Sequence, residues 1–311
     1  MKKVRLGRTG LDVTQLGYGA LEVRGTPDAG GGRMPNEEHA NKILNAVLDS
    51  GINFIDTAWC YGRSEEMMGR YIAERRDEYV LAAKAGHGRC NATRLNGYTR
   101  DDIMTCIEET LERLRTDHVD ILQLHNPTPE DVESNGSIEA LQEIKAQGMT
   151  RFIGVSSVLP HLEKHLATGA YDVFQIPYSA LEPEHHDIIT KIAEAGGGTI
   201  IRGGVAKGEP ESVSVAESRV QNWKPSLGGS SGLKRWDMFE AADLDGFRAE
   251  NESRTAFLLR FTMSHPHVHT IIVGTQNPDH LTDNVEAAQR GALSPDDYAE
   301  VKRRLESVGF K

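Results

Sequence analysis

Four side chains capable of acid–base chemistry lie at or just beyond the ends of apolar segments that are typical of strands. The first of these segments ends at Asp56, and Tyr61 follows shortly after it. Two further segments end at Lys84 and at His125. A phenol, a cation, a carboxylate and an imidazole suit a reaction that transfers a proton and stabilises a developing charge. Catalytic groups collected at the carboxyl ends of strands indicate an active site on a parallel barrel.

Eight short apolar segments have the composition of strands buried on both faces of a sheet. They span residues 14–18, 52–55, 79–83, 119–124, 152–155, 173–176, 199–201 and 270–273. Segments with helical spacing separate them. This alternation predicts a single (β/α)8 TIM barrel, with residues 1–311 as one domain.

The helical segments carry recognisable start signals. Acidic Glu65 and Glu66 follow Ser64, where they would interact favourably with the positive end of a helix. Thr99, three residues before Asp102, resembles a capping box. The expected helices cover residues 36–50, a segment from 64, a segment after 99, and residues 137–147, 183–195, 251–263, 278–290 and 295–307.

Two segments interrupt the regular alternation. Residues 3–13 precede the first barrel strand and contain turn signals, so we expect a hairpin that closes the floor of the barrel. Residues 203–251 follow the seventh strand and form a long loop that should lie over the active-site face. Trp223 and Trp236 in this loop could close over an apolar substrate, although plain packing is the more common role of such residues.

Composition narrows the classes of partner. The net charge of -11 argues against nucleic acid or an anionic membrane surface, which recruit basic patches. No apolar run approaches the roughly 20 residues of a membrane span, and the amino terminus lacks the apolar core of a signal peptide. These features predict a cytoplasmic protein with neither nucleic-acid nor membrane partners, and they specify no oligomeric state.

Cysteine and histidine usage predicts no disulfide framework and no metal. The three cysteines are odd in number and lack a CxxC spacing, which fits a reducing compartment. Cys60, between Asp56 and Tyr61, is interpreted as a small wall residue, with a reactive thiol as the alternative. The histidine tract 265–269 precedes the eighth strand and is expected to be a solvated loop, and His185 and His186 are expected at the surface.

The ordered motifs of the chain resemble those of the aldo-keto reductase family over almost its whole length. The motifs are Asp56-Thr57-Ala58 with Tyr61-Gly62, Lys84, His125, Gly154-Val155-Ser156-Ser157, Gln175, and Gly274-Thr275 with Asn284. The resemblance implies NAD(P)H-dependent reduction of an aldehyde or ketone to an alcohol. A small carbonyl compound is therefore the expected substrate.

This chemistry gives the four residues distinct roles. Hydride addition leaves negative charge on the carbonyl oxygen, which Tyr61 would protonate. A neighbouring ammonium, Lys84, favours release of the phenolic proton, and Asp56 would hold that ammonium in place. His125 would orient and polarise the carbonyl oxygen through a ring nitrogen. As an alternative, all four could be structural. Lys84 and Asp56 would then be a plain buried ion pair, Tyr61 a loop anchor and His125 a core histidine.

The resemblance also implies positions for the cofactor. Gln175 can contact a nicotinamide carboxamide with both its donor and its acceptor. Further contacts are expected from Gly19, Ser156, Ser157, Gly203, Gly204, Lys207, Gly274, Thr275 and Asn284. Gly203, Gly204 and Lys207 would lie beside the pyrophosphate, where backbone N–H groups can bind it.

Several cofactor positions depart from the common pattern of the family. Ser157 stands where the family usually has Asn. Arg202 stands where the family often has an aromatic residue, so it would stack on the nicotinamide or contact a phosphate, or else form an ion pair at the rim. Gln276 and His280 occupy places where a cation commonly binds the 2′-phosphate of NADPH. The resemblance favours NADPH, with NADH possible.

Two residues near the predicted carbonyl site are candidates for the substrate pocket. Trp59 lies between Asp56 and Tyr61, and His87 follows Lys84 closely. A different class of function remains open as the alternative, namely a cofactor-binding regulatory or redox-sensing subunit on the same fold. The complete set of four residues favours the enzyme, because a pure sensor could lack one of them.

Overall fold

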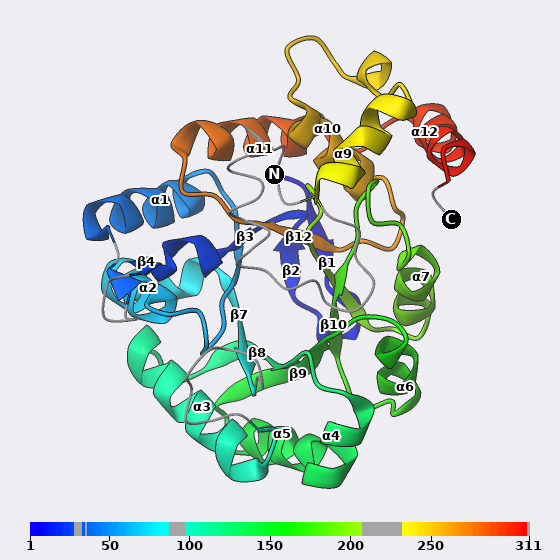
Figure 1. Ribbon diagram of the computed structural model, residues 1–311. Helices are drawn as coiled ribbons and strands as arrows, with labels where there is room; N and C mark the ends of the chain where they lie inside the picture. The colour runs from blue at the N-terminus through cyan, green and yellow to red at the C-terminus, as the bar shows by residue number, and fades with distance from the viewer. Residues whose placement is uncertain (28–32, 35, 87–96, 207–231, 310–311) are drawn as a thin grey trace.

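The computed structural model describes residues 1–27, 33–34, 36–86, 97–206 and 232–309, and it contains a closed barrel of parallel strands ringed by helices (Figure 1). This arrangement confirms the predicted (β/α)8 barrel. In chain order the barrel strands are β3 (Leu16–Gly19), β6 (Phe54–Asp56), β7 (Val80–Ala85), β8 (Val119–His125), β9 (Thr150–Ser156), β10 (Val173–Pro177), β11 (Gly198–Arg202) and β12 (Thr270–Val273). Pairing of β12 with β3 closes the ring.

The register of the strands brings the predicted site residues to one end of the barrel. Gly19 lies opposite Asp56, and His125 lies opposite Ser156, which in turn lies opposite Gln175. All these strands are parallel, so their carboxyl ends share one rim. Residues distant in sequence therefore become neighbours at this rim.

Helices cover the outer surface of the barrel, and most lie where the spacing of apolar residues predicts them. They are α1 (Glu37–Asp49), α2 (Ser64–Tyr71), α3 (Arg100–Leu114), α4 (Pro129–Asn135), α5 (Ser137–Ala146), α6 (His161–Ala167), α7 (His186–Glu194), α9 (Gly232–Ala241), α10 (Arg254–Met263), α11 (Pro278–Arg290) and α12 (Pro295–Ser307). The sequence analysis did not predict α4, α6 and α9. The first two are single short helices of 7 residues, too short to display a clear periodicity.

Side-chain caps define where several helices begin. The Thr99 side chain accepts a hydrogen bond from the backbone N–H of Asp102, which confirms the predicted start of α3. Asn36 caps α1 in the same way by accepting from the backbone N–H of His39. Each cap satisfies an amide that has no partner inside its helix.

The predicted amino-terminal hairpin is present and closes one end of the barrel. Strand β1 (Lys3–Arg5) pairs antiparallel with β2 (Asp12–Thr14), and the pair lies across the centre of the ring in Figure 1. The hairpin contributes Leu6, Leu11 and Val13 to a buried apolar cluster with residues from the barrel strands, namely Phe54, Ala82, Ile121, Val173 and Ile200. The hairpin therefore seals the floor of the barrel, opposite the rim that carries Asp56.

A small strand pair and four short 3-10 helices are the remaining elements of the described residues. A small antiparallel pair consists of β4 (Thr26–Pro27) and β5 (Arg33–Met34). The 3-10 helices are η1 (Gly7–Thr9), η2 (Ala20–Arg24), η3 (Ala73–Glu78) and η4 (Asp245–Phe247). Helix η2 directly follows β3, so it lies beside the rim of the barrel that carries Asp56.

The long segment after β11 is only partly the loop that the sequence predicted. Helix α9 forms within it, and Trp236 on this helix is buried against Phe239, with ring centroids 5.6 Å apart. The indole of Trp236 therefore belongs to the core, in agreement with the plain-packing interpretation. Trp223 lies outside the described residues.

The histidines near the seventh and eighth strands are less exposed than predicted. His265 is buried, and its ring packs 4.4 Å from that of His186 and 5.4 Å from that of Tyr178. His185 is also buried and accepts a hydrogen bond from the backbone N–H of Leu159. The expectation of solvent exposure is thus wrong for His265, which packs against His186 and Tyr178, and for His185, whereas His186, His267 and His269 are partly exposed.

The described residues contain neither a metal-ligand cluster nor a helix that could cross a membrane. Among these residues, no group of three or more His, Cys, Asp or Glu side chains is arranged to hold a metal ion. No helix within the same ranges has the length and apolar character needed to cross a membrane.

Candidate active site

A buried ion pair between Lys84 and Asp56 forms the centre of the site. The Lys84 ammonium donates a hydrogen bond to the Asp56 carboxylate, and the two side chains are 0% and 2% exposed. Lys84 Nζ also lies 3.1 Å from the carbonyl oxygen of Thr57 and 3.5 Å from the hydroxyl of Tyr61. The structure therefore brings three of the four predicted residues into direct contact.

The loop after β6 places Tyr61 over this pair. The backbone N–H of Tyr61 donates to the carbonyl of Ala58 at 2.9 Å, and the N–H of Ser64 donates to the carbonyl of Tyr61 at 3.0 Å. These turn contacts hold the half-buried ring so that Lys84 Nζ lies 5.0 Å from its centroid. An ammonium close to both the face and the hydroxyl of a phenol stabilises the phenolate form.

Burial and charge act in opposite directions on this group. Burial raises the pKa of Tyr61, and the positive charge of Lys84 opposes part of that rise. Burial also lowers the pKa of Lys84, but the charges of Asp56 and Tyr61 outweigh it, so the Lys84 pKa lies above its ordinary value. Near neutral pH the site thus holds a protonated phenol beside a charged ammonium, which is the state that a proton donor requires.

His125 ends β8 on the other side of Tyr61. The two rings meet edge to face, with centroids 5.7 Å apart and planes at 80°. The backbone carbonyl of His125 accepts a hydrogen bond of 2.8 Å from the Tyr98 hydroxyl. Nδ1 of the imidazole lies 3.5 Å from the thiol sulfur of Cys60, a contact that the sequence analysis did not predict.

Asp56 also connects the ion pair to Gln175. The Gln175 amide nitrogen donates to the second carboxylate oxygen of Asp56 at 2.7 Å, and its amide oxygen accepts from the Ser156 hydroxyl at 3.1 Å. Gln123 on β8 donates to the same carboxylate oxygen at 3.4 Å. Gln123 was missed from the sequence, although its place two residues before His125 puts both side chains on the same face of β8.

Trp59 is tied to α3. Its indole N–H donates to the Glu109 carboxylate at 2.9 Å, and Arg113 lies 5.4 Å from the ring centroid. Arg113 also donates to the backbone carbonyl of Trp59 at 3.2 Å, while the backbone N–H of Trp59 donates to the carbonyl of Lys84 at 3.1 Å. Contacts on both sides thus fix the loop that carries Tyr61.

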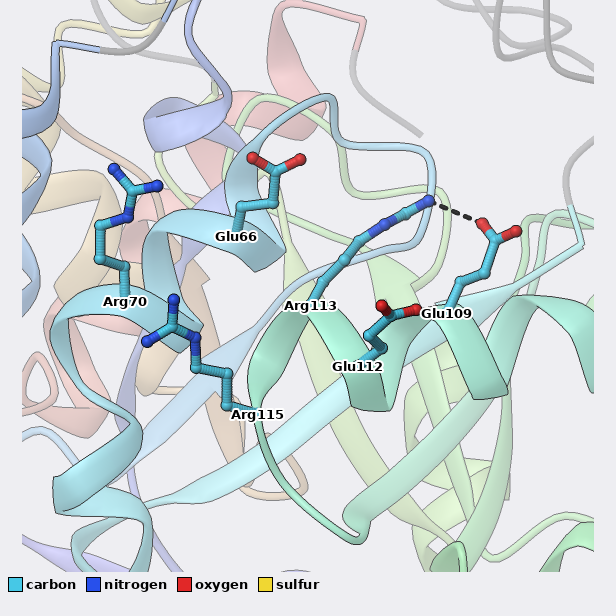
Figure 2. Close-up of a pocket in the computed structure, with 6 residues that line it drawn as sticks. All are labelled: Glu66, Arg70, Glu109, Glu112, Arg113 and Arg115. Carbon is cyan, nitrogen blue, oxygen red and sulfur yellow. Dashed lines mark hydrogen bonds and ion pairs between the residues drawn. The ribbon is translucent and has the colours of Figure 1, made fainter.

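A charged cavity of about 450 Å³ lies beside this anchor, between α2 and α3 (Figure 2). Its walls are Glu66, Arg70, Glu109, Glu112, Arg113 and Arg115. In Figure 2 Arg113 extends along the cavity toward Glu109, to which it donates at 2.7 Å. None of the four predicted catalytic residues lines this cavity, so we assign it no part in the chemistry.

Comparison with known proteins identifies the family. The model of the Aldo/keto reductase family matches residues 15–306, nearly the whole chain. The chain belongs to the aldo/keto reductase family. It is therefore an NAD(P)H-type oxidoreductase, and nicotinamide cofactors are those of its family.

The chain is similar over most of its length to several individual proteins. An uncharacterized oxidoreductase of Bacillus subtilis, YqkF, is 29% identical over 100% of this chain and 99% of its own. The holo form of aldo-keto reductase AKR11C1 from Bacillus halodurans matches with a TM-score of 0.80 and 26% identity, covering 98% of this chain and 96% of that one. A putative voltage-gated potassium channel subunit beta of Schizosaccharomyces pombe is 27% identical over 91% of this chain and 87% of its own.

The residues of this aldo/keto reductase fit a nicotinamide at Gln175. Its amide uses one donor and one acceptor position within the protein, so a second N–H and a second lone pair remain for a carboxamide. Ser157 is buried next to Ser156, and its backbone N–H donates to the carbonyl of Gln175 at 3.1 Å. The neighbouring strands thus present the polar groups that a carboxamide needs.

The carboxyl end of β12 provides the features expected for the phosphate and adenosine ends. A Cβ on Gly274 would lie 2.9 Å from the carbonyl oxygen of Gly19, so the bare backbone permits this close approach. Thr275 is buried, and its carbonyl accepts from the Tyr18 hydroxyl at 2.9 Å. Helix α11 begins directly after this loop, capped by Asn277, and offers the backbone N–H groups that favour anions.

Three further side chains lie on this segment. Asn284 is buried on α11, whereas Gln276 and His280 are exposed. The Gln276 amide donates to the backbone carbonyl of Glu22 on η2. Gln276 therefore bridges the β12 loop and η2, in the region where the resemblance places the 2′-phosphate.

Arg202 ends β11 close to the catalytic group. Burial lowers the pKa of its guanidinium, and the charges of Tyr61, Glu182 and Asp56 oppose that change. Gly203 follows it with φ of +71°, a conformation that glycine adopts without strain, and Gly204 comes next. The two other predicted contacts in this region, His87 and Lys207, lie outside the described residues.

Proposed function

We propose that this protein reduces an aldehyde or ketone to an alcohol with NAD(P)H, and that Tyr61 is the general acid. The observation that carries the proposal is the contact of Lys84 with both the Asp56 carboxylate and the Tyr61 hydroxyl, beside His125. A simple ion pair needs only Asp56 and Lys84. The addition of a phenol and an imidazole supplies a proton donor and a group that can orient the acceptor.

The four side chains would act together on the carbonyl oxygen. The reduced nicotinamide supplies hydride to the carbonyl carbon when it is bound. Tyr61 donates its proton to the oxygen as negative charge develops, and Lys84 stabilises the phenolate that results. His125 holds the oxygen in place by donating from a ring nitrogen, and Asp56 keeps the ammonium charged and oriented.

The cofactor assignment extends this proposal. Gln175, Ser156 and Ser157 would hold the carboxamide, and Arg202 would contact the nicotinamide or a phosphate. The segments Gly203–Gly204 and Gly274–Gln276, with Gly19, His280 and Asn284, would bind the remainder of the dinucleotide. We favour NADPH because of the family resemblance. NADH is the alternative, because the exposed Gln276 and His280 lack the fixed positive charge that would select a 2′-phosphate. A comparison of kcat/KM with both cofactors tests this choice, and a preference for NADH above tenfold would reverse it.

The acid role of Tyr61 is tested by Tyr61→Phe. We expect turnover of 4-nitrobenzaldehyde to fall by roughly 10²-fold or more, because that is the usual contribution of a positioned acid. The Kd for NADPH should stay within about twofold, since removal of one hydroxyl leaves the carboxamide contacts in place. Tyr71→Phe is the matched control, because the Tyr71 hydroxyl binds Glu37 on the surface. Full activity of Tyr61→Phe would remove it as the acid.

A regulatory role is the second candidate, favoured by the similarity to the putative potassium channel subunit. A cofactor-binding sensor would bind NADPH tightly yet show no turnover with a panel of generic aldehydes. Turnover by the unmodified protein that is lost in Tyr61→Phe would instead support the enzyme. The same two measurements therefore separate the candidates.

A further inference from the structure

We propose that Cys60 is a positioning residue that sets the tautomer of His125, by donating its thiol hydrogen to Nδ1 of the imidazole. This inference rests on the proposed function, in which His125 orients the carbonyl oxygen. It concerns a contact between the β6 loop and the end of β8. The Cys60 sulfur lies 3.5 Å from His125 Nδ1, within reach of a hydrogen bond to sulfur.

The direction of this hydrogen bond follows from the chemistry of the two groups. An ordinary thiol titrates near ~8.5 and is therefore protonated at neutral pH. A thiol is a weak donor, whereas an unprotonated imidazole nitrogen is a good acceptor. If Nδ1 accepts, a neutral ring must carry its proton on Nε2, because only one ring nitrogen is protonated in each tautomer. The contact thus selects the form with Nε2–H.

The surroundings limit how His125 can escape this arrangement. Its backbone carbonyl accepts from Tyr98, and the next N–H, that of Asn126, donates to the carbonyl of Ser156 at 2.8 Å. The Tyr61 ring packs against the imidazole edge to face. These contacts hold the backbone and pack one side of the ring, and the Cys60 contact opposes rotation of the ring.

The consequence for catalysis is a fixed donor. An imidazole with Nε2–H can donate to the carbonyl oxygen as that oxygen gains negative charge. The other tautomer would present an unprotonated nitrogen, which repels the same oxygen. Cys60 would then act on the substrate through His125, in the same way that a group at one ring nitrogen sets the other in metal-bound histidines.

The test combines a spectroscopic signature with kinetics on the full chain. Long-range ¹H–¹⁵N spectra of ¹⁵N-histidine-labelled protein report which ring nitrogen carries the proton, and His125→Asn identifies the His125 signals by their loss. In the unmodified protein we expect Nδ1 unprotonated and Nε2 protonated. Cys60→Ala should mix the two tautomers and lower kcat about three- to tenfold, with KM for NADPH unchanged within about twofold.

Two variants separate positioning from general damage. Cys60→Ser keeps a donor at the same position and should restore both the Nε2–H tautomer and kcat to within about threefold of the unmodified protein. Cys106→Ala removes the buried thiol of α3, a different element from the β6 loop and β8, and should alter neither. An unchanged tautomer in Cys60→Ala, or a doubly protonated ring in the unmodified protein, would overturn the proposal. The tautomer is measured without turnover. An inactive protein would therefore refute the proposed reaction, while the tautomer measurement would still test the role of Cys60.

Discussion

Replacing Asp56 by Asn is expected to disrupt two subsites at once, because this carboxylate accepts hydrogen bonds through both oxygens. One oxygen faces Lys84, and the other faces Gln175 and Gln123. An amide has only one acceptor oxygen. Whichever way the Asn side chain turns, its NH₂ group therefore faces a donor, either the ammonium or the glutamine amides. The variant leaves size and shape almost unchanged, so the effect reports charge and hydrogen bonding.

The expected magnitude follows from burial. Lys84 and Asp56 are 0% and 2% exposed, so solvent cannot replace the lost partner. Removing one member of a buried pair typically costs about 3–5 kcal/mol, because the remaining charge is left uncompensated. With an unfolding entropy of ~2.1 cal/mol/K per residue, a chain of this length loses about 1.5 °C per kcal/mol, so the thermal midpoint should fall by roughly 5–8 °C.

Scanning calorimetry of a double-mutant cycle measures this loss. Lys84→Met removes the charge and keeps an apolar chain of similar length, so Lys84→Met combined with Asp56→Asn leaves no charge in this pair. We expect the double variant to lose about 2 kcal/mol less unfolding free energy than the two single variants lose in sum. Additive losses, or a midpoint change below about 1 °C for Asp56→Asn, would refute the view that the pair is desolvated and coupled.

Two further predictions concern charge outside the catalytic pair. Burial raises the pKa of Glu65 from 4.5 to about 7, so the folded chain binds more protons than the unfolded chain between these values, and stability falls as pH rises through this window. Glu65→Gln should make the fall in unfolding free energy between pH 5 and pH 8 smaller by roughly 3 kcal/mol. Glu66→Gln, at the half-exposed neighbouring position, is the control and should leave this fall unchanged. Gln276→Arg should shift the NADPH to NADH ratio of kcat/KM about tenfold toward NADPH, since a guanidinium can bind a 2′-phosphate. Gln289→Arg, at the far end of α11, adds the same charge and should leave that ratio unchanged.

The barrel could be predicted from the sequence because its strands and helices have distinct periodicities. The segment 119–124 is apolar except at Asp120 and Gln123, and the corresponding β8 is buried along its whole length. Once the strands are parallel, their carboxyl ends must share a rim, so Asp56, Lys84 and His125 had to approach one another. The direct contact between Lys84 and Tyr61 depends on the short turn after β6. The sequence indicates this turn, because Tyr61 follows Asp56 by only five residues.

Contacts between separate elements could not be predicted in the same way. Trp59 was assigned to the substrate pocket from its position in the chain, yet its indole N–H binds Glu109 on α3. That partner depends on how α3 packs beside the β6 loop, which periodicity does not specify. His265 was expected in solvent for a similar reason. Its burial arises from packing against His186 and Tyr178, which the sequence pattern does not specify.

The position of Gln175 explains how the catalytic pair and the cofactor region can vary separately. Departures from the common family pattern lie at Ser157, Arg202 and Gln276, on β9, β11 and the loop after β12. Among the described residues, Gln175 joins Asp56 to the region expected to hold the nicotinamide carboxamide. Its amide donates to Asp56 and accepts from Ser156. A substitution beyond this amide can alter how the dinucleotide is held while the carboxylate keeps its charge and its contact with the ammonium. We therefore propose that residues at the rim determine cofactor choice, whereas the buried pair beneath it determines the capacity to donate a proton.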